Sequence, residues 1–210
     1  MVNITPELVG DIVRQTLNGI ELANIPIGIS NRHVHLTEEH FHQLFPGEEL
    51  QPIRKLKQAG EFAAEQTVTV VGQKGMQERV RILGPFRKQS QVELSMTDAR
   101  YLGIPATVCL SGNLNNAADV TLRNGNNEIT IKGAIVAKRH IHMSFKDAER
   151  FRLSEDASLK VRIVTEGRTT IFEDVGLRFG ENYILEMHID TDEANSAGVK
   201  HETVACLIRD

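Results

Sequence analysis

The sequence contains Asn31-Arg32-His33-Val34-His35-Leu36-Thr37, and 107 residues later it contains the related stretch Lys138-Arg139-His140-Ile141-His142-Met143-Ser144. Each copy follows a run rich in Ile, Val and Gly, and each ends on a residue that can cap a helix. Alternate residues of a strand face the same side, so each copy presents a pair of histidines. Such a pair supplies half of a metal site. We therefore favour metal binding over the alternative, a duplicated structural turn with incidental histidines.

Composition limits the class of protein. The chain has 210 residues, 40% of them hydrophobic and 25% charged, which suits one large globular domain or two small ones. A net charge of −4 without a basic stripe argues against nucleic acid as a partner. No apolar run approaches the roughly 20 residues of a membrane span, and no secretory signal is expected. Cys109 and Cys206 lie far apart in apolar runs, which favours reduced thiols and a cytoplasmic location over a disulfide or a metal thiolate.

Residues 5–20 are predicted to form an amphipathic helix. Thr5 can cap it, and Pro6 suits its first position. Its apolar residues recur at helical spacing, namely Leu8, Ile12, Val13, Leu17 and Ile20. We expect this apolar face to pack on the body of the protein. The alternative is that the helix docks a partner.

After residue 25 the sequence predicts mainly short strands. Asn124-Gly125 is a hairpin signal, and Glu166-Gly167 indicates a second corner. Many short strands are typical of barrels or sandwiches, and the long periodic helices of a doubly wound fold are missing. The repeat at 107 residues indicates two similar units. The predicted strands cover residues 25–30, 66–71, 78–83, 90–94, 106–110, 119–123, 128–131, 134–137, 158–165, 169–172, 176–179, 183–189 and 203–208.

A metal-capable residue, an apolar residue and a helix-capping residue follow one another four times. The four triplets are His35-Leu36-Thr37, Glu93-Leu94-Ser95, His142-Met143-Ser144 and His188-Ile189-Asp190. Three of them continue with an acid that can reach back to the cap, as in a capping box. Caps alone would explain why strands end there, but not why His or Glu precedes the cap by two residues each time. The pattern predicts equivalent strand corners for these four residues, joined by His33 and His140 through strand alternation.

These six residues suffice for one crowded metal site or for two adjacent sites. Catalytic zinc commonly takes three protein ligands and keeps a fourth position open, so two such sites would use all six. The spacing also permits a mixed division of the ligands. The natural division places His33, His35 and Glu93 in one site and His140, His142 and His188 in the other.

Arg87 lies in a loop marked by Gly84-Pro85, shortly before Glu93. Its side chain could therefore reach the same cleft as Glu93. Arginine binds phosphate through two parallel hydrogen bonds. An arginine beside an open zinc position indicates a phosphate substrate, whereas the alternative is a surface arginine without a role.

Most of these motifs are shared with a known family. The chain resembles the PduL-type phosphotransacylases, also called phosphate propanoyltransferases, from about residue 25 to its C-terminus, while the N-terminal helix is matched only in kind. The matching stretches are residues 27–36, 64–68, 83–95, 97–103, 111–114, 135–144 and 185–194.

The resemblance implies a mainly β fold with short helices, in which two β-barrel domains are capped by α-helices and the active site lies at their interface. Residues 1–20 would form the N-terminal helix. One barrel would combine residues 21–31 with 138–210, and the other would comprise residues 32–137. Relatives inside bacterial microcompartments carry a short amphipathic N-terminal segment for encapsulation. The helix is therefore a candidate encapsulation segment that contacts the shell or other cargo, and the protein would be cytoplasmic or enclosed in a microcompartment.

The implied reaction transfers an acyl group reversibly from propanoyl-CoA or acetyl-CoA to phosphate, giving acyl phosphate and CoA. Direct attack by phosphate is favoured, because no Ser–His–Asp arrangement or reactive cysteine motif is evident. A zinc-dependent hydrolase of a thioester or related substrate is one alternative. A non-enzymatic zinc-stabilised binding module is another, although the scarcity of cysteine argues against it. A homodimer is expected. The resemblance implies two Zn²⁺ ions, one bound by His33, His35 and Glu93 and the other by His140, His142 and His188, with Arg87 holding phosphate.

Overall fold

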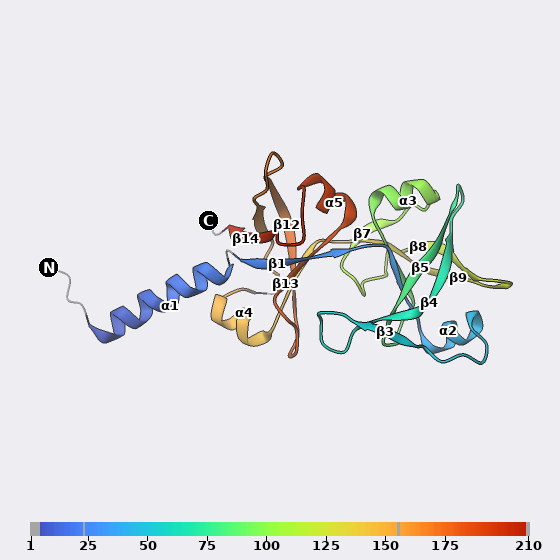
Figure 1. The fold of residues 1–210 in the computed structure, drawn as a ribbon, viewed down its shortest axis with the longest axis horizontal. Coiled ribbons are helices and arrows are strands. Elements are labelled where there is room, and N and C mark those ends of the chain that lie inside the picture. Colours follow the sequence, from blue (N-terminus) through green and yellow to red (C-terminus); the bar gives the residue numbers. More distant parts are fainter. Residues whose placement is uncertain (1–4, 23, 155, 209–210) are drawn as a thin grey trace.

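The computed structural model describes residues 5–22, 24–154 and 156–208. Figure 1 shows two β-barrels side by side, with short helices around them and one long helix that projects from the body. The predicted mainly β fold with two helix-capped barrels is confirmed.

The barrel formed largely by the C-terminal half is called the C-terminal barrel. Its strands follow one another around the wall in the order β1-β13-β10-β12-β11-β14, and β14 pairs with β1 to close the ring. The first of these strands comes from the start of the chain, before every strand of the other barrel. The bounds are β1 (Ile25–Ser30), β10 (His140–Met143), β11 (Leu159–Ile163), β12 (Thr170–Phe179), β13 (Glu186–Asp190) and β14 (Val204–Ile208).

The other ring is called the N-terminal barrel. Its strands pair in the order β4-β5-β2-β6-β9-β8, and β8 returns to β4. Two further strands, β3 and β7, pair with β4 and β9. The bounds are β2 (His33–His35), β3 (Pro52–Lys55), β4 (Phe62–Val71), β5 (Met76–Gly84), β6 (Gln91–Leu94), β7 (Thr107–Cys109), β8 (Ala118–Asn124) and β9 (Asn127–Ala137).

The two rings repeat one pattern of strand pairing. β10 lies antiparallel to β13 and parallel to β12, just as β2 lies antiparallel to β6 and parallel to β5. β1 is parallel to β13, and its counterpart β9 is parallel to β6. The chain passes between the barrels at residues 31–32, which join β1 to β2, and again at 138–139, which join β9 to β10. The duplicated histidine motif therefore begins at both crossings.

Four short helices begin at the predicted caps. The side chains of Thr37, Ser95, Ser144 and Asp190 each accept a hydrogen bond from the backbone N–H three residues later. The complete reciprocal capping box forms between Asp190 and Glu193. Because a capped helix must start there, each preceding strand ends at a fixed residue. The helices are α2 (Glu38–Leu44), α3 (Met96–Leu102), α4 (Phe145–Phe151) and α5 (Thr191–Ser196).

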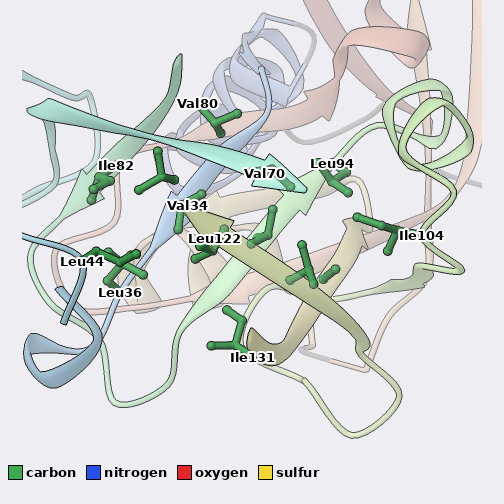
Figure 2. Packing of buried hydrophobic residues seen from close by; sticks show 14 of the residues in the cluster. Val34, Leu36, Leu44, Val70, Val80, Ile82, Leu94, Ile104, Leu122 and Ile131 are labelled. Atoms are coloured by element: carbon green, nitrogen blue, oxygen red, sulfur yellow. The ribbon is translucent and has the colours of Figure 1, made fainter. Parts of the chain in front are cut away.

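Each barrel has its own apolar core. Val34 is fully buried in the N-terminal core, and Ile141 is fully buried in the C-terminal core. Figure 2 shows Val34 with Val80 and Leu122 among the side chains of the first core. Since strand residues alternate in direction, the histidines on either side of Val34 and Ile141 face away from the core. Burial of the apolar residue thus fixes where each histidine pair points.

Apart from shifts of a few residues at strand ends, the strand predictions differ from the structure in three places. The predicted strands 128–131 and 134–137 are one strand, β9, which continues through Gly133. Glycine lets the backbone of Ser90 approach closely there, since a Cβ at residue 133 would lie 2.6 Å from the carbonyl oxygen of Ser90. The predicted strands 169–172 and 176–179 are also one strand, β12. It is continuous through a β-bulge near Asp174, whose φ is 55°. β3 was not predicted, since its exposed edge position gives no alternating apolar pattern. The hairpin at Asn124-Gly125 is confirmed between β8 and β9.

The first helix, α1 (Pro6–Leu22), begins as predicted, with the N–H of Leu8 donating to Oγ1 of Thr5 at 3.2 Å. Of its predicted apolar face, Ile12, Val13 and Leu17 are 50–54% exposed, and the side chain of Ile20 lies outside the described part of the chain. The helix projects away from the barrels (Figure 1), so the expectation that this face packs on the body is wrong. Among the described residues, no helix has the length and apolar character needed to cross a membrane.

Candidate metal centres and active site

The first cluster forms where β2 pairs with β6. His33 lies in register opposite Glu93, and His35 follows on the same face of β2. The Oε1 atom of Glu93 lies 3.6 Å from Nε2 of His33 and 3.9 Å from Nε2 of His35. All three residues are buried, and their potential ligand atoms lie within 4.8 Å of one another.

The second cluster forms at the equivalent place in the C-terminal barrel. His140 lies in register opposite His188, and Nε2 of His140 is 3.1 Å from Nε2 of His142. The potential ligand atoms of these three residues also lie within 4.8 Å of one another. The structure thus brings the six sequence-predicted residues together as two groups of three, in the natural division and not a mixed one.

Hydrogen bonds fix the protonation of two imidazoles. Nδ1 of His33 lies 2.8 Å from the carbonyl oxygen of Asn31, and Nδ1 of His140 lies 2.8 Å from that of Lys138. A carbonyl oxygen only accepts, so each Nδ1 carries a hydrogen, and Nε2 is the nitrogen left for a metal. In addition, Nδ1 of His142 is buried without a hydrogen-bond partner. Nε2 is therefore the nitrogen through which His33 and His140 each face their own cluster.

Burial sets the charges in the clusters. Burial lowers the pKa of His140 to about 4, and burial together with the neighbouring imidazoles lowers that of His142 to about 2. In the first cluster, burial opposes the charge on Glu93, but His33 and His35 outweigh it and hold the pKa of Glu93 well below its usual range. A buried carboxylate beside two imidazoles is a donor set that zinc binds. The residues present fit zinc at both clusters.

Acid should destabilise the metal-free protein through the second cluster. The pKa of His140 falls from 6.5 to about 4 on folding, so below pH 6.5 the unfolded chain binds a proton that the folded chain does not. Stability is therefore fully present above pH 6.5 and is lost as pH falls toward 4, by roughly 3 kcal/mol from this residue. Urea unfolding of chelator-treated protein between pH 7.5 and 4.5 measures the loss. His140→Leu should flatten the curve, and an equally steep curve in that variant would contradict the prediction.

Arg87 lies beside the first cluster and is held by two side chains. Its Nη1 donates to Oγ of Ser111 at 3.1 Å, and its Nη2 donates to Oε1 of Glu61 at 3.3 Å. Oγ of Ser111 also accepts from Nε2 of Gln91 at 2.9 Å, and the same amide group donates to Oε1 of Glu93 at 2.6 Å. A chain of hydrogen bonds therefore links Arg87 to the first cluster.

The arginine that opens each histidine motif is also held in place. Arg32 forms an ion pair of 2.9 Å with Asp98, the third residue of α3, and Arg139 forms one of 2.8 Å with Glu193, the third residue of α5. In both barrels the motif is thus tied to the helix that follows the neighbouring strand. The carboxylate of Asp98, which was predicted to reach back to the helix cap, instead pairs with Arg32.

Both clusters and Arg87 face one cavity of about 1110 Å³. Its lining comes from both barrels, and it includes apolar and basic side chains beyond the predicted residues. The cavity has room for a drug-sized ligand or larger. The lining residues include His33, His35, Glu93, Arg87, His140, His142, His188, Ile53, Phe86, Tyr183, Arg54, Arg79 and Arg178.

Comparison with known proteins identifies the family. A family model described as phosphate propanoyltransferase matches residues 26–200 of the chain. The chain belongs to the phosphate propanoyltransferase family. The phosphate propanoyltransferase of Limosilactobacillus reuteri is 50% identical over 193 residues, which cover 91% of this chain and 89% of that protein. That of Salmonella typhimurium is 47% identical over 193 residues, which cover 91% of this chain and 92% of that protein. The family resemblance is confirmed, and with it the assignment of the chain as an acyltransferase.

Several polar residues that contact the predicted site residues were not predicted from the sequence. Gln91, Ser111 and Glu186 are buried, and each hydrogen-bonds another residue of the site. A signal existed for Gln91 and Glu186, because each precedes a predicted corner residue by two positions and so shares its strand face. Ser111 carries no comparable pattern.

Proposed function

We propose that the protein transfers the acyl group of propanoyl-CoA, or of acetyl-CoA, directly to phosphate at two zinc ions in the cavity between its barrels. The observation that carries the proposal is the pair of three-residue clusters that open onto the same cavity as Arg87. We take residues 21–31 with 138–210 as one domain and residues 32–137 as the other. His33, His35 and Glu93 would hold one zinc ion, and His140, His142 and His188 would hold the second.

The protein's own residues supply binding and orientation. Arg87 would hold phosphate with its planar guanidinium and place an oxygen near the thioester carbonyl. Ser111 and Glu61 would fix the rotamer of Arg87 before phosphate arrives. The chemistry that bound zinc supplies is polarisation of that carbonyl and stabilisation of the departing CoA thiolate. The apolar part of the cavity wall, including Phe86 and Tyr183, would keep water away from the thioester.

The release of free CoA from propanoyl-CoA tests the proposal. It should depend on phosphate and yield propanoyl phosphate in equal amount. Chelator treatment should abolish it, and added zinc should restore it. Release at the same rate without phosphate would instead support a zinc-dependent hydrolase. Zinc binding with no turnover of any thioester would support a non-enzymatic binding module.

Neither cysteine should be required, because phosphate attacks directly. Cys109 hydrogen-bonds Thr107 on β7, and Cys206 lies on β14; neither lines the cavity. Cys109→Ala and Cys206→Ala should each retain at least half of the wild-type kcat, measured by CoA release. Loss of turnover in either variant, with normal zinc content and melting temperature, would point to an acyl-enzyme.

The exposed apolar face of α1 is proposed to be an encapsulation segment for a bacterial microcompartment. Support comes from its amphipathic sequence and from the exposure of Val9, Ile12, Val13 and Leu17. Deleting residues 1–20 should leave kcat and melting temperature unchanged but abolish enrichment of the enzyme in purified compartments. A variant with Ile12→Asp and Leu17→Asp should behave in the same way. Equal enrichment of the deleted and full-length proteins would contradict the proposal.

A further inference from the structure

Gln91 and Glu186 occupy equivalent positions in the two barrels. Gln91 on β6 lies in register opposite His35, and Glu186 on β13 lies in register opposite His142. Both are almost fully buried, with exposed fractions of 1% and 7%. Neither belongs to the groups of residues whose ligand atoms cluster together. A buried polar side chain at this position in both barrels requires a partner.

In each barrel the partner is the corner residue two positions later on the same strand. The amide of Gln91 donates to Oε1 of Glu93 at 2.6 Å, and Oε2 of Glu186 lies 2.8 Å from Nε2 of His188. The direction of the hydrogen bond differs between the two barrels and suits the corner residue in each. A carboxylate at the corner is supported by an amide that donates, and an imidazole at the corner is supported by a carboxylate that accepts.

We propose that Glu186 is a positioning residue for His188. Accepting the hydrogen on Nε2 of His188 leaves Nδ1 of the same ring unprotonated and fixes the ring orientation, which is how carboxylates support histidine ligands of metals. The inference rests on the proposed function, because it requires zinc at the second cluster. It adds a residue whose role is to hold a ligand.

Glu186 is itself held from the opposite barrel. Nζ of Lys57 lies 3.1 Å from Oε1 of Glu186, and the amide of Gln58 donates to its Oε2 at 3.4 Å. Gln58 is 3% exposed and also exchanges two hydrogen bonds with the backbone of Ile184, at 3.0 and 3.1 Å. These contacts hold both oxygens of the carboxylate. The loop between β3 and β4 of the N-terminal barrel thus supports a ligand in the C-terminal barrel.

Zinc retention tests the proposal without relying on turnover. Wild-type protein and the nearly isosteric Glu186→Gln are loaded with zinc and titrated with a chromophoric chelator. Wild type should release two equivalents, and in Glu186→Gln one of the two should be held roughly 10- to 100-fold more weakly. Glu186→Asp, which keeps the charge, should recover part of the loss. Glu128→Gln removes an exposed carboxylate paired with Arg123 and should match wild type.

Each outcome is decisive. Two zinc ions in wild type with both affinities unchanged within twofold in Glu186→Gln would overturn the positioning role and leave the proposed function standing. A wild-type protein without stoichiometric zinc would overturn the proposed function and this role with it. Melting temperatures of the metal-free proteins show whether the variant is folded. Should Glu186→Gln not fold, Lys57→Gln replaces it, and a loss of affinity confined to one zinc ion is again the expected result.

Discussion

Replacing His33 or His140 with alanine is expected to lower kcat by about 10³-fold or more and to remove one zinc ion per chain. Each variant loses one of three ligands at its cluster, and Lewis-acid stabilisation of the transition state is worth several kcal/mol. The two substitutions act on different barrels, so each should leave the other zinc ion in place. Metal analysis after gel filtration, combined with phosphate-dependent CoA release, measures both effects.

His42→Ala is the matched control for these variants. His42 is exposed on α2 and lies outside both clusters, so zinc content and turnover should stay at wild-type levels. Thermal unfolding identifies any variant that has lost its fold. If His33→Ala and His140→Ala both lose zinc and yet keep their activity, the two-zinc mechanism is wrong.

Replacing Arg87 with alanine is expected to lower kcat/KM for phosphate by about 10²- to 10³-fold, because a bidentate, charge-assisted contact to the substrate is lost. Arg87→Lys keeps the positive charge but not the planar pair of donors, so it should recover only part of this loss. Zinc content should stay at two per chain in both variants, which separates this effect from damage to the metal centres. Initial rates at varied phosphate and fixed propanoyl-CoA measure the change.

Arg123→Ala provides the control, because Arg123 is a surface arginine paired with Glu128 outside the cavity. Its removal should leave the KM for phosphate unchanged. An Arg87→Ala enzyme with wild-type KM for phosphate would show that another group, such as Arg178 on the cavity wall, binds the substrate.

The six candidate ligands could be identified from the sequence because helix capping and strand alternation both act locally. Caps such as Ser95 and Asp190 end their strands at fixed residues, and buried residues such as Val34 set which face the flanking histidines share. The division into two groups needed more, since it depends on which strands pair. The register of His33 with Glu93 is a long-range property that no local pattern encodes.

Three other features could not be predicted, each for its own physical reason. Gln58 reaches Ile184 across the two barrels, and nothing near residue 58 in the sequence indicates that contact. β3 is an exposed edge strand beginning at Pro52, so it lacks the apolar alternation that identifies strands. For α1, the pattern predicted the helix correctly, but an apolar stripe alone does not determine whether it packs within the chain or remains exposed.

The placement of β1 has a consequence for the order in which the protein is made. Residues 32–137 contain every strand of the N-terminal barrel, so this ring has all its strands once residue 137 has left the ribosome. β1 is synthesised earlier but pairs with β13 and β14, which are synthesised after that barrel. The backbone hydrogen-bonding groups of β1 therefore lack their native partners while the N-terminal barrel is being synthesised. Ring closure of the C-terminal barrel therefore joins β1 to strands that are synthesised only after the whole N-terminal barrel.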